Sequence, residues 1–538
     1  MRALVCRHGG WKSGALVASA AVLLAASPAQ AGLVRVTLQP YIVQATTAPI
    51  AHQAVDAVIT ANGGVGQVVV DLPLVNGVLA SLTSVEVTQL PVGDAVSPDL
   101  TVLTSMAPAA GGPRQPPPSR QPNNVFPQVT GASSVVAGGN SGQGIGVAVI
   151  DTGIAPLPDF TGRLSAGTDL SGEGNAQLDS YGHGTFVAGL IGGDGSSSHG
   201  AYVGEAPGVT LVPVKVAGAS GSTTVSTLIL ALQWIQTDLT DNIHVINMSV
   251  GAIPQGPTAA NPLDQAVEAM WKLGYVVVTS AGNNGPNRGT VTSPGDDPLV
   301  ITAGALDDKG TVTTADDAVP SFSSHGPTSW NGWWKPDLLA PGKSVISVMS
   351  PTSFIWNNFK SARVGTSNFV GSGTSFAAAI TSGAAALLID AHPTAASPNN
   401  VKAALLTTTN AGPGPPQDPF QQGHGVLNVA RAIAEPTVDM VQDVSSVPSP
   451  VAKAKISLLS TQVVSTWATV TPAEQLLEPY PFPYSGPATT STDPHVPGSM
   501  LFQSSAWNSS AWNSSAWNSS AWNSSAWNSS AWNSSAWN

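Results

Sequence analysis

The chain is poor in cysteine and in charge. Its one cysteine, Cys6, lies in an N-terminal stretch that we expect to be removed, so the mature chain would have none. Disulfides, thiolate metal sites and a cysteine nucleophile are then excluded, and stability must come from the core or from bound ions. Charged residues make up 9% of the 538, with 19 basic against 31 acidic and a formal net charge of −12. So few basic residues argue against a nucleic-acid partner, whose phosphates require clusters of Lys and Arg.

Residues 1–31 have the features of a secretory signal. Arg2, Arg7 and Lys12 precede or flank a short apolar run, and Ala29-Gln30-Ala31 is a small-residue cleavage site. The apolar run is too short to span a membrane comfortably and no second span follows, so a membrane anchor is the weaker interpretation. We expect cleavage after Ala31 and secretion. The exported chain then has 16 basic and 31 acidic residues, a net charge of −15.

Hydrophobic residues make up 42% of the chain, whose length suits about three domains with at least one large core. Residues 32–106 alternate short strands with helices, which predicts a small α+β sandwich domain. The expected strands lie at 40–45, 66–72 and 100–105, and the expected helices at 49–64 and 82–90. Residues 107–122 are Pro-rich and predict an exposed linker.

Residues 123–436 alternate buried strands with helices. Near-continuous apolar runs predict strands buried on both faces, at 144–151, 209–216, 243–250, 275–282 and 299–306. Helical stretches lie between them, at 223–239 and 261–274. This pattern predicts an α/β domain around a parallel sheet. In such domains functional sites form beyond the carboxyl ends of the strands.

The C-terminal part of the chain has no such pattern. Residues 437–503 are rich in Pro, Ser and Val, and we interpret them as a linker. Residues 504–538 are seven copies of SSAWN, which hold seven of the 15 Trp and whose spacing gives no stripe on a helix. Two interpretations stay open: a flexible low-complexity tail, or a tail whose Trp side chains contact carbohydrate or a cell surface. The repeated Asn-Ser-Ser is also a glycosylation sequon, which matters only in a host that glycosylates.

Three polar residues stand where functional sites are expected. Asp151 ends an apolar run in VIDTGI, His183 begins a glycine-flanked helix in YGHGTFVAGLIGG, and Ser375 opens a helix in SGTSFAAAITSG. Each has an ordinary explanation when taken alone: a turn residue, a surface histidine or lone metal ligand, and a helix cap. Together they are what acyl transfer needs, because a nucleophilic serine requires a base and the base requires an acid to orient it. Asp, His, Ser is one of the known chain orders for such a triad.

A resemblance to a known family supports this interpretation. The segments VIDTGI, GHGTFVAGLIGG, NMSVG, SAGNNGP, SFSSHGP, KPDLLAPG and GTSFAAA resemble, in this order, the motifs of the subtilisin-like serine peptidase family (subtilases). GHGVLNVARAI resembles that family's closing helix segment, so the resemblance covers residues 125–436. It implies a subtilisin-like three-layer α/β domain with a mostly parallel sheet. It also implies that Asp151, His183 and Ser375 form the triad, and that no cofactor is required.

The resemblance implies roles for further residues. Asn283 in AGNNG would donate a side-chain N–H to the oxyanion, beside the backbone N–H of Ser375 at a helix start. Without the triad, Asn283 would be an ordinary turn residue. An extended polypeptide substrate would lie between two walls. One wall would be Met248, Ser249, Val250 and Gly251, and the other Ala281 and Gly282, although Met248 and Val250 are equally explained as core residues.

Residues 32–106 resemble the inhibitory propeptide of the same family. We therefore expect self-cleavage between residues 107 and 125, with a retained accessory domain as the other interpretation. Asp159 in PLPDF matches a calcium ligand of some relatives. One carboxylate is not a site, because calcium binds six to eight oxygens, so we predict no metal site.

The sequence thus predicts a secreted serine endopeptidase, extracellular or at the cell surface, that acts on polypeptides and is inhibited by its own propeptide. The competing hypothesis is a catalytically silent surface-binding protein that uses the peptidase fold as a scaffold. The presence of all four residues, Asp151, His183, Ser375 and Asn283, argues against that hypothesis.

Overall fold

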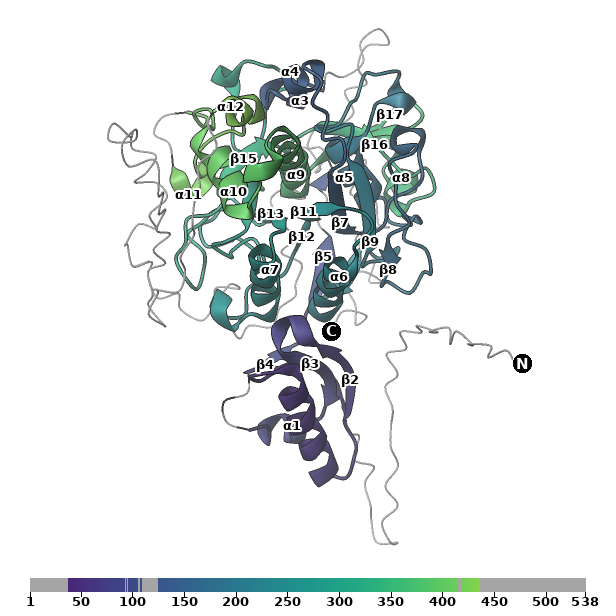
Figure 1. The fold of residues 1–538 in the computed structure, drawn as a ribbon, viewed down its shortest axis with the longest axis vertical. Helices are drawn as coiled ribbons and strands as arrows, with labels where there is room; N and C mark the ends of the chain where they lie inside the picture. The colour runs from purple at the N-terminus through teal and green to yellow at the C-terminus, as the bar shows by residue number, and fades with distance from the viewer. Residues whose placement is uncertain are drawn as a thin grey trace, which may run out of the picture.

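The computed structural model describes residues 37–91, 93, 95–104, 107–108, 124–414 and 418–435. Four predicted segments lie wholly or almost wholly outside the described residues: the signal at 1–31, the Pro-rich linker at 107–122, the segment 437–503 and the SSAWN array. Figure 1 shows two bodies within the described part, a small N-terminal domain and a larger domain above it.

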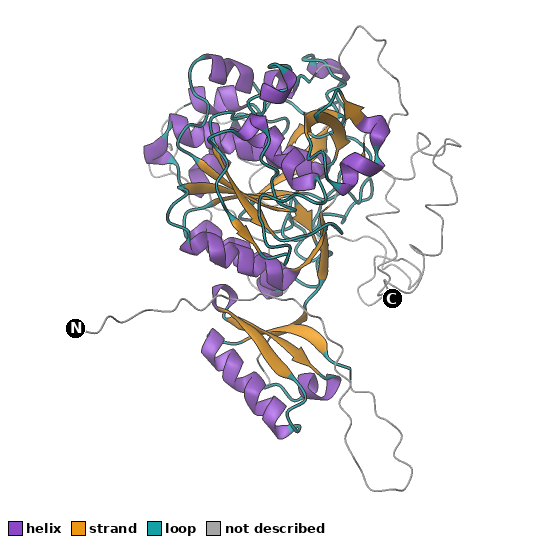
Figure 2. Cartoon of the chain, turned by 90° about the vertical axis from the view of Figure 1, so that its right-hand side faces the viewer, coloured by secondary structure: helices purple, strands orange, loops and turns teal. Residues whose placement is uncertain are grey.

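The N-terminal domain is a four-stranded antiparallel sheet with helices on one face (Figure 2). Its strands are β1 (Gln39–Gln44), β2 (Gln67–Leu72), β3 (Gly77–Leu82) and β4 (Ala95–Pro98), in the order β2-β3-β1-β4. Its helices are α1 (Ala48–Ala61) and α2 (Ser84–Thr88). Thr47 is the N-cap residue of α1, and Gly63 and Gly64, both with positive φ, follow the C-terminus of this helix. The core is built from apolar residues of α1, β1 and β3, such as Val55, Val43 and Val78.

Two of these strands were not predicted from the sequence. β3 and β4 lie in stretches rich in Gly, Ala, Ser and Pro, whose intrinsic strand preference is weak. The strand predicted at 100–105 exists as β5 (Thr101–Thr104), but it does not join the sheet of its own domain. It pairs with two short strands of the larger domain.

The larger domain is organised around a seven-stranded sheet in which every pair is parallel. The strand order is β15-β14-β13-β11-β7-β9-β8. The bounds are β7 (Gly146–Asp151), β8 (Thr168–Asp169), β9 (Thr210–Lys215), β11 (Ile243–Met248), β13 (Val276–Ser280), β14 (Ile301–Leu306) and β15 (Leu338–Pro341). Strands such as β7 and β14 are buried at every residue, as their continuous apolar runs predicted. The predicted α/β fold with a mostly parallel sheet is confirmed.

Helices cover both faces of this sheet and make three layers (Figures 1 and 2). α5 (His183–Gly192) and α9 (Thr374–Ala391) lie on one face, and α6 (Val225–Thr237) and α7 (Pro262–Lys272) lie on the other, next to the N-terminal domain. Among the described helices, α9 is long and apolar enough to cross a membrane, but 89% of its apolar window is buried, as befits a core helix.

The remaining elements surround these layers. The helices are α3 (Phe126–Val129), α4 (Ala132–Ala137), α8 (Phe354–Asn358), α10 (Pro398–Thr407), α11 (Pro419–Gln422) and α12 (Val429–Ala434). The strands are β6 (Ala107–Pro108), β10 (Ser222–Thr224), β12 (Val250–Gly251), β16 (Val345–Val348), β17 (Arg363–Val364) and β18 (Asn368–Ser372).

Candidate active site

The predicted acid and base are in direct contact. Asp151 is the last residue of β7, and His183 is the first residue of α5. His183 Nδ1 lies 2.8 Å from both carboxylate oxygens of Asp151, and both side chains are fully buried. Thr152 N donates to Asp151 Oδ1 at 2.7 Å, which fixes the carboxylate. This contact orients the imidazole so that Nε2 is the atom left to exchange a proton.

The glycines around His183 permit this close approach. Gly182 has φ +112, in the left-handed region that favours glycine, and it is the residue from which α5 begins. A Cβ on Gly184 would lie 2.2 Å from the carbonyl oxygen of Gly153, so any side chain there would push α5 away from the loop after β7. The sequence motif thus sets the distance between two elements.

Asp179 supports the same arrangement, and the sequence analysis missed it. Its carboxylate accepts from Gly182 N at 2.6 Å and Thr185 N at 2.8 Å, which caps α5, and from Thr152 Oγ1 at 2.8 Å. Burial raises the pKa of this carboxyl, and the hydrogen bonds from Thr185, Gly182 and Thr152 partly oppose the rise. The usual capping signal does not identify Asp179, because the N-cap position directly before α5 is Gly182 and Asp179 stands three residues earlier.

Ser375 lies in the first turn of α9 and is fully buried. Its Oγ donates to the carbonyl oxygen of Ser249 at 3.2 Å, and its own carbonyl oxygen accepts from Ser249 Oγ at 2.9 Å. The ring of the next residue, Phe376, stacks on the His183 ring with centroids 5.8 Å apart. His183 Nε2 is buried and has no hydrogen-bond partner within the described part of the chain. Because Phe376 follows Ser375 directly, the stacked rings place His183 beside the first turn of α9, and catalytic hydrogen bonds often tighten only with substrate.

Asn283 follows β13 and contacts the residue before Ser375. Its Oδ1 accepts from Thr374 N at 2.9 Å and Thr374 Oγ1 at 3.0 Å. Because these contacts engage the oxygen of the amide, its Nδ2 donors lie on the opposite side. Gly282 N also donates to Thr374 Oγ1 at 3.1 Å, so Thr374 ties the second wall to the start of α9.

The residues predicted for substrate binding differ in their surroundings. Val250 and Gly251 form β12, which pairs antiparallel with β5 through Thr104 and Leu103. Met248 is fully buried at the end of β11, where it packs in the core rather than at a surface. Ala281 is fully buried, and it and Gly282 stand near Ser375 through the Thr374 contacts.

Asp159 does not stand in a group of metal ligands. It is fully buried, and its Oδ2 accepts from the backbone N–H and the hydroxyl of Ser197. Among the described residues no group of three or more His, Cys, Asp or Glu side chains could hold a metal ion.

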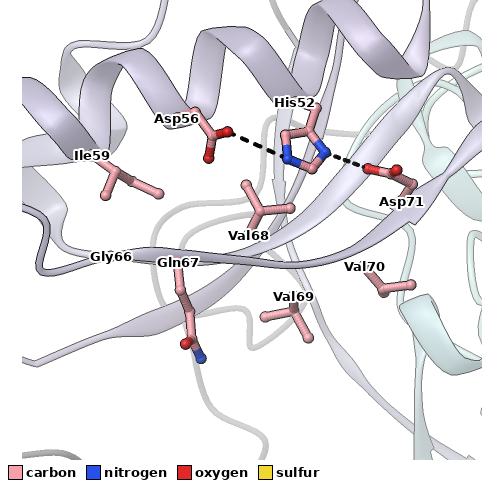
Figure 3. A pocket seen from close by; sticks show the side chains of 9 residues that line it. All are labelled: His52, Asp56, Ile59, Gly66, Gln67, Val68, Val69, Val70 and Asp71. Atoms are coloured by element: carbon pink, nitrogen blue, oxygen red, sulfur yellow. Dashed lines mark hydrogen bonds and ion pairs between the residues drawn. The ribbon is translucent and has the colours of Figure 1, made fainter.

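An open cavity of about 480 Å³ lies elsewhere, on the N-terminal domain (Figure 3). The ring of His52 on α1 stands between two carboxylates, with Nδ1 2.7 Å from Asp71 and Nε2 3.4 Å from Asp56. The hydrogen bond that His52 donates to Asp71 raises the pKa of His52, against a smaller opposing effect of desolvation. All three side chains are more than a third exposed, and the cavity wall holds no serine or cysteine nucleophile. This cavity therefore lacks the nucleophile that a second serine or cysteine peptidase site would need.

Comparison with known proteins identifies the family. A model described as the subtilase family matches residues 142–425, which include all four predicted catalytic residues. The chain belongs to the subtilase family. It is a serine protease of the subtilisin type, as the sequence predicted.

Individual relatives agree with this assignment. The subtilase is 41% identical over 310 residues to serine protease AprX of Bacillus subtilis, across 56% of this chain and 69% of that protein. It is 32% identical to subtilisin DY of Bacillus licheniformis, across 56% of this chain and 95% of the relative. Extracellular serine proteinase of Thermus sp. is 37% identical across 49% of this chain and 55% of its own length.

A solved structure supports the fold. Fervidolysin from Fervidobacterium pennivorans, a keratinolytic enzyme related to subtilisin, matches with a TM-score of 0.59 at 23% identity. The match covers 76% of this chain and 63% of that chain.

Proposed function

We propose that this subtilase is a secreted serine endopeptidase made as a precursor that processes itself. Ser375 Oγ attacks the peptide carbonyl carbon while His183 Nε2 takes its proton. Asp151 holds the imidazole and stabilises the imidazolium, and His183 then gives the proton to the leaving amine. Water then attacks the acyl carbon while His183 Nε2 takes its proton, and His183 returns that proton to Ser375 Oγ as the carboxylic acid product leaves. The observation that carries the proposal is the fully buried Asp151–His183 pair beside the first turn of α9.

The oxyanion formed in this reaction would be held by Asn283 and the backbone N–H of Ser375. The orientation of the Asn283 amide supports this role, because its oxygen is held by Thr374. The start of α9 adds the positive end of a helix dipole. Removing one such donor typically costs about 10²- to 10³-fold in rate.

The substrate would be a polypeptide bound as an added strand. The subtilase's own β5 gives the model for this binding, because it is the middle strand of a three-stranded antiparallel sheet between β10 and β12. Main-chain hydrogen bonds of this kind hold a peptide largely without regard to its sequence.

The position of β5 also supports an inhibitory propeptide. β5 lies along the proposed substrate wall at Val250 and Gly251, and β6 pairs with Gly371 and Ser372, just before Ser375. Two polar contacts join the same domain to helices α7 and α6: Gln44 Nε2 donates to Gln265 Oε1 at 2.8 Å, and Leu74 N donates to Gln233 Oε1 at 3.4 Å. A segment in this place would exclude other peptides until it is cut.

The same pairing favours a processing bond upstream of the linker. Thr104 is opposite Val250, which follows the Ser375 contact Ser249, and Ala107 is opposite Ser372, three residues before Ser375. We therefore place the bond between Thr104 and Ala107 rather than in the range 107–125 that composition suggested. The first residue of the mature chain would then be Ser105, Met106 or Ala107.

Expression of the wild type beside Ser375→Ala tests the function. The wild type should yield a shortened chain that a fluorophosphonate labels at Ser375, whereas Ser375→Ala should keep its N-terminal domain and take no label. Ser134→Ala is a matched control, because this exposed hydroxyl on α4 donates only to Gly131 O and should behave like the wild type. If the wild type and Ser375→Ala both stay uncut and unlabelled, the peptidase function fails and the silent surface-binding protein is favoured.

A further inference from the structure

A carboxylate of the N-terminal domain is bound at the start of helix α6. Asp99 lies two residues before β5. Ser226 N donates to its Oδ1 at 2.8 Å, and Ser226 Oγ donates to its Oδ2 at 2.7 Å. Ser226 itself is only 3% exposed. One residue in the first turn of the helix thus engages both oxygens of the carboxylate.

The peptide segment next to Asp99 is bound by the same stretch of the larger domain. β10 runs directly into α6, so a strand edge and a helix start follow one another in the chain. Leu103, Val102 and Thr101 are opposite Ser222, Thr223 and Thr224. Val225 N then donates to Leu100 O at 3.0 Å, and Ser226 binds Asp99. Five successive residues, 99–103, therefore contact five successive residues, 222–226.

We propose that residues 224–226 form a substrate subsite that binds an acidic side chain. The Asp or Glu that it binds would lie five residues before the substrate position that corresponds to Thr104. This inference rests on the proposed function, since it treats residues 99–104 as a mimic of a bound polypeptide. Once those residues leave the cleft, the backbone N–H and hydroxyl of Ser226 are the donors that a substrate carboxylate would meet.

The chemistry of the subsite favours a carboxylate over a neutral side chain. The start of α6 carries the positive end of the helix dipole, and both donors of Ser226 converge on one group. The net negative charge of the chain opposes this only weakly, because charges beyond the Debye length of about 8 Å at physiological salt are screened.

Burial limits the size of the effect. It raises the pKa of Asp99, although the hydrogen bonds from Ser226 and Thr224 lower it, so part of the gain is spent removing the carboxylate from water. Hydrogen bonds to a charged group are stronger than those between neutral groups, and this desolvation cost offsets part of the gain, so we expect about 5- to 10-fold in affinity.

The test compares peptides cut by the mature enzyme. The parent peptide has the sequence of residues 99–108, DLTVLTSMAP, with a fluorophore and a quencher at its ends. Two others replace its first Asp with Asn or Ala. The expected order of kcat/KM is Asp, Asn, Ala, with about 5- to 10-fold between Asp and Ala, mostly in KM because the subsite is remote from the reacting bond.

Two enzyme variants separate the subsite from the rest of the cleft. Ser226→Ala loses one of the two donors and should reduce the preference for Asp to about 2-fold or less. Thr227→Ala is the matched control, because its hydroxyl lies in the same turn and contacts Thr224 rather than Asp99. Equal cleavage of the Asp and Ala peptides by the wild type, or a preference that Ser226→Ala leaves intact, overturns the proposal.

A second measurement does not depend on catalysis. In the uncut Ser375→Ala chain, adding Asp99→Ala should speed amide hydrogen exchange at Ser226, with the amides of α7 as internal reference. Unchanged exchange at Ser226 overturns the subsite even if peptides are cleaved. Fluorophosphonate labelling of Ser375 reports the proposed peptidase function separately, so labelling without a preference for Asp rejects the subsite alone.

Discussion

At the scale of single residues, the Asp151–His183 contact depends on Asp179. Its carboxylate holds three groups at once, and each belongs to a segment that carries one side of the contact. Thr152 follows Asp151 directly, while Gly182 and Thr185 flank His183. Since Asp179 is 1% exposed, water cannot replace it when it is lost.

We therefore expect Asp179→Ala to be destabilising and to slow catalysis. Three buried donors lose their acceptor, which should cost about 2–4 kcal/mol of unfolding free energy in urea. Misplacement of His183 should lower kcat by about 10- to 100-fold with little change in KM. Asp179→Asn keeps one acceptor oxygen and should recover part of both.

The exposed residue Asp316 provides the control for this prediction. Asp316→Ala removes a carboxylate at the surface and should change neither quantity appreciably. If Asp179→Ala reduces stability but leaves kcat of the folded enzyme unchanged, Asp179 holds the fold without positioning His183.

The sequence predicts a triad more readily than it predicts the residues that position the triad. Asp151, His183 and Ser375 each have an ordinary explanation alone, but their motifs together, in order along the chain, indicate a triad. Asp179 and Thr374 act through contacts between segments that are far apart in the chain, such as Thr374 with Asn283. Spacing along one sequence does not reveal such contacts.

At the scale of elements, strands are predicted more readily than their partners. The apolar runs of the parallel sheet are strong signals because both faces of each strand are buried. β5 was also predicted as a strand, but its partners lie in another domain. The pattern of a strand shows which of its side chains face a core. It does not show which other strand pairs with its backbone.

Three buried carboxyl groups lie together where the connection between β13 and β14 meets the start of α7. Asp296 and Asp297 lie in this connection, and Asp264 lies in the first turn of α7. Burial raises the pKa of Asp296 from 3.8 to about 7 and raises the pKa of Asp264 and Asp297 well above that ordinary value. The neighbouring Asp carboxyls add to the rise at Asp264.

These shifts predict that this region loses stability as pH rises. A raised folded pKa contributes stability that is full below the unfolded value near 4 and is lost as pH rises through about 7. Asp337 does not titrate in this pH range, because Lys335 and Lys402 lower its pKa despite its burial. The stability that Asp337 contributes is therefore lost only in stronger acid.

Urea unfolding of the wild type and Asp296→Asn between pH 5 and pH 8 tests this prediction. The variant should show a smaller fall in unfolding free energy with rising pH. The difference between the two proteins is the quantity to compare, because burial lowers the pKa of His424 to about 4 and gives an opposite slope in both. Equal slopes would show that Asp296 does not titrate in this range.

At the scale of the whole molecule, the N-terminal domain and the larger domain are joined through β5 and the strands that pair with it. β5 pairs with β12, which follows Ser249, a residue that contacts Ser375, and β6 pairs with β18, which ends three residues before Ser375. If the bond to be cut lies between Thr104 and Ala107, as proposed, its own nucleophile is present at an effective concentration far above that of a second molecule.

Self-processing should accordingly be intramolecular. The first-order rate constant for loss of the precursor should stay constant across a 100-fold dilution, followed by gel densitometry after refolding from denaturant. A rate proportional to protein concentration would mean that one molecule cuts another. Mixing wild type with Ser375→Ala separates the two routes further, because a segment paired in its own cleft is not presented to a second enzyme. We expect the Ser375→Ala precursor to remain uncut while the wild type in the same tube is processed.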